Sequence, residues 1–476
     1  MTKTLTPDIC VIGAGSGGLT VAAAAAAFGV PVVLIEKGEM GGDCLNYGCV
    51  PSKALIAAAK HAASAREASA FGIGLPEDFP VDFKVVNRHV RSVIEAIAPN
   101  DSVERFIAMG VTVIRARAAF KDTRTVVAGE HEIRARRFVI ATGSSPFLPP
   151  IEGLDTVPYF TNETIFTNQR RPTHLIVIGG GPIGIELAQA HLRLGSRVTV
   201  VEGVKALGKD DPELTAIVLD RLRREGLEIL EGSKVVGVER RGKTGVRVRI
   251  FRDDLEEVID GSDLLVAVGR SPNVEGLGLK EAGIAYDRKG IRVAPDLRTR
   301  NRRVYAIGDV AGSLQFTHVA GYHAGLVIRS ILFRQKARAD TSIIPWVTYT
   351  DPELAHVGLG EDAAREKHGS ISVLRWPYHE NDRAQAERRT VGMIKVIAGK
   401  RGRILGASIV GANAGEIINL WALAISSGLK LSDMTAYVAP YPTLSEIGKR
   451  AAVTYYTPMA RKPFVRWLVR FLRKFG

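Results

Sequence analysis

Residues 8–18 read Asp-Ile-Cys-Val-Ile-Gly-Ala-Gly-Ser-Gly-Gly, an apolar stretch that leads directly into a glycine-rich loop. An alanine-rich segment follows, and then a second apolar stretch, residues 32–36, which ends at Glu36. This order predicts a buried strand, a tight glycine turn, a helix whose free N–H groups bind phosphate, and a second strand. Gly13 is expected to make the tight turn, and Gly15 to let the backbone approach a pyrophosphate. Gly18 is expected to let the helix pack closely on the strand. Glu36 is expected to accept hydrogen bonds from ribose hydroxyls.

The same unit occurs a second time. Residues 175–184 read Leu-Ile-Val-Ile-Gly-Gly-Gly-Pro-Ile-Gly, and the next apolar stretch ends at Glu202. In both copies the acidic residue follows the third glycine by eighteen positions. Two matched copies predict an α/β protein with two Rossmann-like dinucleotide-binding domains. The glycines of the second loop are Gly179, Gly181 and Gly184.

A pair of cysteines lies just after the first unit. Residues 41–53 read Gly-Gly-Asp-Cys-Leu-Asn-Tyr-Gly-Cys-Val-Pro-Ser-Lys and contain Cys44 and Cys49. A purely stabilising disulfide is a poor explanation, because so short a loop constrains the unfolded chain little. Thiols beside a dinucleotide site can pass two electrons between a cofactor and a disulfide. The third cysteine, Cys10, is expected to be a small buried core residue.

This stretch closely resembles the redox motif of the pyridine nucleotide–disulfide oxidoreductases, the family of dihydrolipoamide dehydrogenase, glutathione reductase and mercuric reductase. The resemblance implies that Cys49 lies nearest the flavin of FAD and that Cys44 exchanges with the substrate. It also implies that Lys53 lies by flavin N5, paired with Glu186. Further residues implied to contact the cofactors are Gly143, Gly269, Asp309, which would hold the flavin ribitol, and His318, on a helix that points at the flavin.

The resemblance further implies a homodimer built from a FAD-binding domain (1–150 and 276–340), a NAD-binding domain (151–275) and a C-terminal α+β dimerisation domain (341–460). NADH is expected to be preferred over NADPH. The carboxylate of Glu202 suits a ribose 2′-hydroxyl and repels a 2′-phosphate, although Lys205 is close enough in the sequence to soften the effect.

Several positions depart from the family pattern. Asp43 stands where Thr is usual, Tyr47 replaces a small apolar residue, and Pro182 stands where glutathione reductase has a tyrosine gate. The largest departure is Tyr441, which occupies the place of the family's acid/base His, whereas Glu446 of the same motif is kept. Tyrosine has a reference pKa of about 10 and is a poor base at neutral pH. Exchange with a dithiol substrate should therefore be impaired, unless His318 or another group stands in.

The closing segment, residues 461–476, is a separate feature. It carries six of the basic residues of a chain whose net charge is +14, and no acid. Arg466, Arg470, Arg473 and Lys474 fall near one helical face. The other face carries Phe464, Leu468, Phe471, Leu472 and Phe475. This pattern predicts a basic amphipathic helix that either lies on a membrane surface or docks on the protein itself. No signal peptide or nucleic-acid module is recognised, so we expect a cytoplasmic protein, either free in the cytoplasm or peripheral on the inner face of the membrane.

The predicted function is that of an FAD-dependent NADH oxidoreductase that passes electrons through the Cys44–Cys49 disulfide to an acceptor. The acceptor could be a disulfide, a metal ion or a quinone. No metal-ligand spacing occurs among the ten histidines, and the C-terminal cysteine pair of mercuric reductase is missing. The alternatives are a dihydrolipoamide dehydrogenase that runs toward NAD reduction and a non-catalytic flavin redox sensor.

Overall fold

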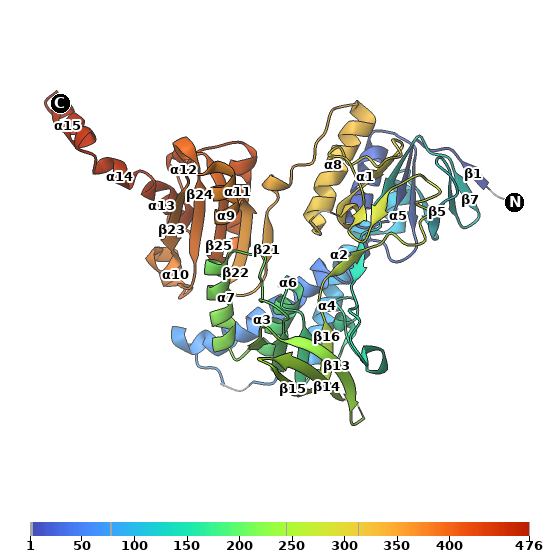
Figure 1. The fold of residues 1–476 in the computed structure, drawn as a ribbon, viewed down its shortest axis with the longest axis horizontal. Coiled ribbons are helices and arrows are strands. Elements are labelled where there is room, and N and C mark those ends of the chain that lie inside the picture. Colours follow the sequence, from blue (N-terminus) through green and yellow to red (C-terminus); the bar gives the residue numbers. More distant parts are fainter. Residues whose placement is uncertain (1–2, 77–78, 244, 313, 476) are drawn as a thin grey trace. The chain divides into compact units, whose positions relative to one another are not determined.

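The computed structural model describes residues 3–76, 79–243, 245–312 and 314–475 (Figure 1). The chain divides into two compact units. The first unit comprises residues 1–203 and 229–339, and the second unit comprises residues 204–228 and 340–476.

A five-stranded parallel sheet forms the centre of the first unit, in the order β20-β8-β2-β3-β4. Alternate residues of its strands face two separate cores, because successive side chains of a strand point to opposite faces. Ile9 and Val11 pack with helices α1 and α8, whereas Cys10 and Ile12 belong to the other core. Cys10 is fully buried, as predicted. The elements of this layer are β2 (Ile9–Ile12), α1 (Ser16–Ala27), β3 (Val32–Glu36), β4 (Thr112–Arg115), β8 (Arg137–Ile140), β20 (Val304–Ala306) and α8 (Thr317–Phe333).

Smaller elements complete this part of the unit. A four-stranded sheet, β1-β7-β6-β5, is formed by β1 (Lys3–Leu5), β5 (Ala118–Phe120), β6 (Val126–Ala128) and β7 (His131–Ile133). Between β3 and β4 lie α2 (Gly42–Asn46), α3 (Cys49–Glu67), α4 (Phe83–Ile97) and α5 (Val103–Ala108).

The second glycine motif lies in a four-stranded sheet with the order β12-β11-β10-β16. Helix α6 follows β10 as the motif predicts, and a three-stranded antiparallel sheet, β13-β14-β15, precedes β16. These elements are β10 (His174–Ile178), α6 (Pro182–Arg193), β11 (Arg197–Val201), β12 (Glu228–Leu230), β13 (Lys234–Arg241), β14 (Gly245–Arg252), β15 (Leu255–Gly261) and β16 (Asp263–Val266).

The two nucleotide-binding motifs are joined by a short antiparallel ladder. Strand β9 (Ser144–Pro146) follows Gly143, and β17 (Arg270–Pro272) follows Gly269. The two strands pair in register, with Arg270 opposite Pro146 and Pro272 opposite Ser144. This ladder brings the ends of two segments that are far apart in the sequence into one site.

A five-stranded antiparallel sheet, β21-β22-β25-β24-β23, forms the second unit. Its core surrounds the fully buried Trp421 on α11. The elements are β21 (Trp346–Thr348), β22 (Glu353–Gly358), α9 (Glu361–His368), β23 (Ser372–Pro377), α10 (Asp382–Ala386), β24 (Met393–Ala398), β25 (Ile404–Gly411), α11 (Ala414–Ser426), α12 (Leu431–Ala436), α13 (Glu446–Thr454), α14 (Thr457–Ala460) and α15 (Pro463–Leu472).

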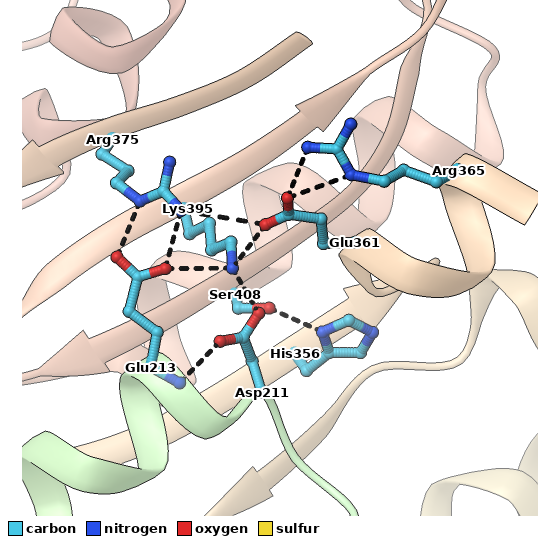
Figure 2. Close-up of polar contacts among 8 residues, drawn as sticks. All are labelled: Asp211, Glu213, His356, Glu361, Arg365, Arg375, Lys395 and Ser408. Carbon is cyan, nitrogen blue, oxygen red and sulfur yellow. Dashed lines mark hydrogen bonds and ion pairs between the residues drawn. The ribbon is translucent and has the colours of Figure 1, made fainter. Parts of the chain in front are cut away.

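Helix α7 (Pro212–Arg224) also belongs to the second unit, although it follows β11 in the chain. Buried Lys395 on β24 contacts three carboxylates: Nζ lies 2.7 Å from Asp211, 3.0 Å from Glu213 and 2.9 Å from Glu361 (Figure 2). Arg375 binds Glu213 with two hydrogen bonds. A buried charge is tolerated when it is paired in this way. These ion pairs connect Asp211 and Glu213, at the start of α7, with β24 of the sheet, and residues 204–228 belong to the second unit. The predicted domain boundaries stay predictions.

No helix within the described ranges is long and apolar enough to cross a membrane. The uncharged stretch from Ile9 to Ile35 forms a strand, a helix and a second strand, as expected from its glycines.

Candidate active site

The first glycine loop has the geometry of a phosphate cradle. Gly13 has φ +104°, and a Cβ there would lie 2.4 Å from the carbonyl oxygen of Ala141. A Cβ at Gly18 would lie 1.9 Å from the carbonyl oxygen of Gly13, so α1 packs on the turn only because this residue is glycine. A Cβ at Gly15 would meet nothing within 4 Å. The loop is therefore open at its middle glycine, directly before the N-terminus of α1.

The second loop repeats these contacts. A Cβ at Gly179 would lie 2.4 Å from the Ala267 carbonyl oxygen, one at Gly184 would lie 2.0 Å from the Gly179 carbonyl oxygen, and Gly181 is open. The acidic residues also correspond. Glu36 accepts a hydrogen bond from the Ala14 N–H at 2.6 Å, and Glu202 accepts one from the Gly180 N–H at 2.7 Å. Each carboxylate is thereby fixed beside its own glycine loop.

The two predicted redox cysteines lie on successive helices. Cys44 is in α2, and Cys49 is the first residue of α3, preceded by Gly48. Both are free thiols. The hydrogen bond from Cys44 lowers the pKa of the Cys49 thiol to about 6, with help from Thr317 and Lys53, whereas the pKa of Cys44 is raised. Cys49 is therefore the thiolate and Cys44 the thiol of the reduced pair at neutral pH.

Thr317 is a contact that the sequence analysis did not identify. Its Oγ1 lies 3.2 Å from the Cys49 sulfur, at the first residue of α8. His318, which was predicted to contact the flavin, is exposed, and its ring stacks on Phe316 with 5.2 Å between the ring centroids. His318 lies on α8, in agreement with the expected helix. Thr317 is the first residue of the helix that the family resemblance directs at the flavin, and this is the signal that could have suggested it, since a hydroxyl there can hydrogen-bond a thiolate.

The predicted pair of Lys53 and Glu186 is formed. Lys53 Nζ lies 2.9 Å from Glu186 Oε2, and the Glu186 side chain is only 7% exposed. The two residues come from α3 and α6 and are 133 positions apart in the sequence. A buried carboxylate needs such a partner, so the ion pair holds Lys53 one turn after Cys49.

The ladder of β9 and β17 supplies a second polar cluster. Arg270 Nε donates to the Ser144 hydroxyl at 2.8 Å, and Ser144 Oγ donates to Asp309 at 2.5 Å. Burial raises the pKa of Asp309. The clustering of Arg270 and Ser144 with Asp309 depends on a pairing of distant strands, which no local pattern reveals.

Two models of known protein families match most of the chain. The family described as "Pyridine nucleotide-disulphide oxidoreductase" matches residues 7–324, and its dimerisation domain matches residues 344–452. The chain belongs to the pyridine nucleotide-disulphide oxidoreductase family. The second match supports a homodimer.

Similar proteins have several named activities. A mercuric reductase of Lysinibacillus sphaericus is 34% identical over 451 residues, which cover 94% of this chain and 82% of that protein. A dihydrolipoyl dehydrogenase of Thermus scotoductus is 36% identical over 453 residues, 93% of this chain and 95% of that protein. The Cu(II) complex of the HOCl-induced flavoprotein disulfide reductase RclA from Escherichia coli superposes with a TM-score of 0.83 at 28% identity, covering 93% and 98% of the two chains.

As a member of this family, the protein is a flavin-dependent oxidoreductase that uses FAD and NAD(P)H. The first glycine loop fits FAD, because its open middle glycine, its tight outer glycines and Glu36 form the cradle described above. Residues that would hold the cofactor are Gly13, Gly15, Gly18, Glu36, Lys53 and Asp309. When bound, FAD supplies the carrier through which electrons from NAD(P)H reach the Cys44–Cys49 disulfide.

Tyr441 and Glu446 lie in the second unit. The Tyr441 side chain is 70% exposed, and its hydroxyl donates to Asp382 at 2.9 Å. This hydrogen bond raises the pKa of Tyr441 further, so the hydroxyl is protonated at neutral pH. Glu446 begins α13 and accepts from the Thr443 N–H at 3.4 Å. That these residues face Cys44 of the other subunit stays a prediction.

NADH should reduce the flavin faster than NADPH does. The Glu202 carboxylate is held beside the second glycine loop, and like charges brought together cost several kcal/mol, so we expect roughly a 100-fold preference. Stopped-flow measurement of flavin reduction with each nucleotide checks this, and Glu202→Gln should narrow the preference. Equal or faster reduction by NADPH would show that Glu202 does not select the nucleotide.

Proposed function

We propose that this protein is an NADH:acceptor oxidoreductase that works in the reductive direction and is a poor lipoamide or glutathione reductase. The observation that carries the proposal is the reduced pair itself: a Cys49 thiol of lowered pKa at the N-terminus of α3, beside the Cys44 thiol. One hydride brings two electrons and one proton. It converts the Cys44–Cys49 disulfide into one thiol and one thiolate, which is the protonation state that the site favours.

The acceptor is the second part of the proposal. Acid/base catalysis of thiol exchange requires a group that titrates near neutral pH, and Tyr441 does not. We infer that the physiological acceptor does not depend on that step, which favours a metal ion or a quinone over a dithiol substrate. The similarity to a mercuric reductase supports the first class.

An acceptor screen on the purified holoenzyme tests both parts. NADH oxidation is followed anaerobically with Hg(II) or Cu(II) in the presence of excess thiol, with a soluble quinone, with lipoamide and with oxidised glutathione. We expect turnover with a metal ion or the quinone, lost in Cys44→Ser. Fast turnover with lipoamide would instead support the dihydrolipoamide dehydrogenase alternative, and no turnover with any acceptor would support a redox sensor.

The C-terminal helix carries a separate proposal, contact with an anionic membrane surface. All ten residues of α15 are described, and none is buried. Phe464, Trp467 and Phe471 form a row of stacked rings with centroid distances of 6.0 and 5.7 Å. Arg466 and Arg470 occur between them in the sequence, and Arg473 follows Phe471. Exposed aromatic residues on a basic amphipathic helix suit the interface of an anionic bilayer.

Liposome co-sedimentation should separate the full-length protein from a chain that ends at Met459. Each basic residue near an anionic surface contributes on the order of 1 kcal/mol, an attraction that salt screens. We therefore expect binding of the full chain at low salt, weaker binding at high salt and none by the shortened chain. Trp467→Ser with Phe471→Ser keeps the charge and should weaken binding. If both lengths stay in the supernatant with anionic vesicles, α15 serves the packing of the protein instead.

A further inference from the structure

Asp43, the residue before Cys44, forms an ion pair inside the active site. Its Oδ1 lies 3.0 Å from Nη2 of Arg270, whose side chain is 10% exposed. The family motif that this stretch resembles usually carries a neutral threonine at this position. The pair therefore adds a carboxylate to the redox helix and supplies it with a fixed partner.

Arg270 is held by contacts other than Asp43. Its Nε donates to the Ser144 hydroxyl at 2.8 Å and its Nη2 donates to the Ser144 carbonyl at 2.7 Å. Ser144 in turn donates to Asp309, the residue expected to hold the flavin ribitol. A continuous set of polar contacts thus runs from the helix of Cys44 to the flavin-binding part of the site.

The carboxylate of Asp43 lies at the thiol end of this set. A Cβ added to Gly48 would lie 2.6 Å from Asp43 Oδ2, so the carboxylate packs against the residue that precedes Cys49. Asp43 is also the chain neighbour of Cys44. The negative member of the ion pair acts electrostatically on both thiols and raises the pKa of each, whereas Arg270 is anchored on the β9–β17 ladder.

We propose that Asp43 and Arg270 are positioning residues that set the electron-donating strength of the Cys44–Cys49 dithiol by opposite electrostatic effects. The reduced pair carries one more negative charge than the disulfide. The Asp43 carboxylate disfavours that charge and makes the dithiol a stronger reductant, and Arg270 limits the effect. This inference rests on the proposed redox role of the two cysteines.

Other charged groups surround the same thiols, and the balance between them determines the protonation of Cys49. The hydrogen bond from Cys44, burial, Thr317 and Lys53 act more strongly on the pKa of Cys49 than Asp43 does. Glu163, whose pKa burial raises, is also within electrostatic range of Asp43. The charged groups that face this region are Glu39, Lys53, Glu163, Glu186 and Asp309.

The direction in which each substitution shifts the pKa of Cys49 and the reduction equilibrium distinguishes an electrostatic role from a purely structural one. Asp43→Asn removes the negative charge and should move the pH at which the thiolate-to-flavin absorption is half lost downward, by roughly 0.5–1 unit. Arg270→Gln leaves the carboxylate uncompensated and should move that pH upward. The equilibrium between the holoenzyme dithiol and dithiothreitol should shift about threefold to tenfold toward reduced enzyme in Asp43→Asn, and the opposite way in Arg270→Gln.

Asp8→Asn is the matched control. Asp8 also forms an ion pair with an arginine, at 2.6 Å from Arg136. Asp8 lies at the amino end of β2, whereas the glycine loop and the active site lie at the carboxyl end of that strand. This variant should leave both readouts unchanged. If Asp43→Asn fails to fold or to retain FAD, Asp43→Thr serves as the neutral variant.

Two results would overturn the proposal: unchanged midpoints in the neutral Asp43 variants, or shifts in the same direction for Asp43 and Arg270 variants. The second pattern would indicate a merely structural role. Absence of the absorption in the wild-type holoenzyme would instead contradict the proposed function, so the two failures are distinguishable.

Discussion

Cys49→Ser should abolish the long-wavelength absorption that anaerobic two-electron reduction produces in the wild-type protein. That absorption requires a thiolate next to an oxidised flavin, and Cys49 is the thiol whose pKa the site lowers. Cys44→Ser should show the band without any reduction, because Cys49 is then free of its disulfide partner. Absorbance spectra of the two variants, recorded under argon, make the comparison.

The pH dependence of the band follows from the same pKa. The thiolate of Cys49 is present above a pH of about 6 and is protonated as the pH falls through that value. Cys10→Ser is the matched control, because this cysteine is fully buried in a core of the first unit. A band that survives Cys49→Ser, or that is lost in Cys10→Ser, would contradict the assignment of Cys49.

Tyr441→His should raise lipoamide reduction by roughly 10²–10⁴-fold, the usual contribution of a general acid/base. The wild-type hydroxyl keeps its proton at neutral pH because Asp382 accepts its hydrogen bond. It can donate a proton but cannot remove one from a thiol. An imidazole titrates in the required range.

Steady-state lipoamide assays of both proteins, with flavin reduction by NADH measured in parallel, test this. Flavin reduction should be equal in the two, since Tyr441 is not part of either glycine loop. Asp382→Asn is a useful second variant: it removes the carboxylate that raises the pKa of Tyr441 and should change lipoamide turnover far less than Tyr441→His does. Wild-type turnover equal to that of an ordinary dihydrolipoamide dehydrogenase would show that another residue supplies the proton.

The local sequence could predict those features that are formed by elements directly following one another in the chain. Gly13 and Gly18 could be assigned to a turn and a close contact because a strand, a loop and a helix follow one another directly, and both assignments are confirmed. The pairing of Lys53 with Glu186 came from resemblance to the family, and the two side chains do meet.

The features that the sequence did not reveal depend on packing between distant segments. Asp43 was recognised as unusual, but its partner Arg270 lies 227 positions further on and reaches it through a strand pair formed by β9 and β17. Helix α7 follows β11 in the chain, and the contacts of Lys395 with Asp211 and Glu213 at its start join segments about 180 positions apart. Thr317 contacts Cys49 across 268 positions of the sequence, so this contact is also absent from any local pattern. The interpretation of His318 as a flavin contact stays a prediction.

An anaerobic titration of the oxidised holoenzyme with NADH, combined with thiol counting, shows whether two electrons from NADH come to rest on Cys44 and Cys49. We expect the first equivalent of NADH to generate two titratable thiols and the long-wavelength band while the flavin stays oxidised. Bleaching of the flavin by the first equivalent, with no band and no new thiols, would contradict it.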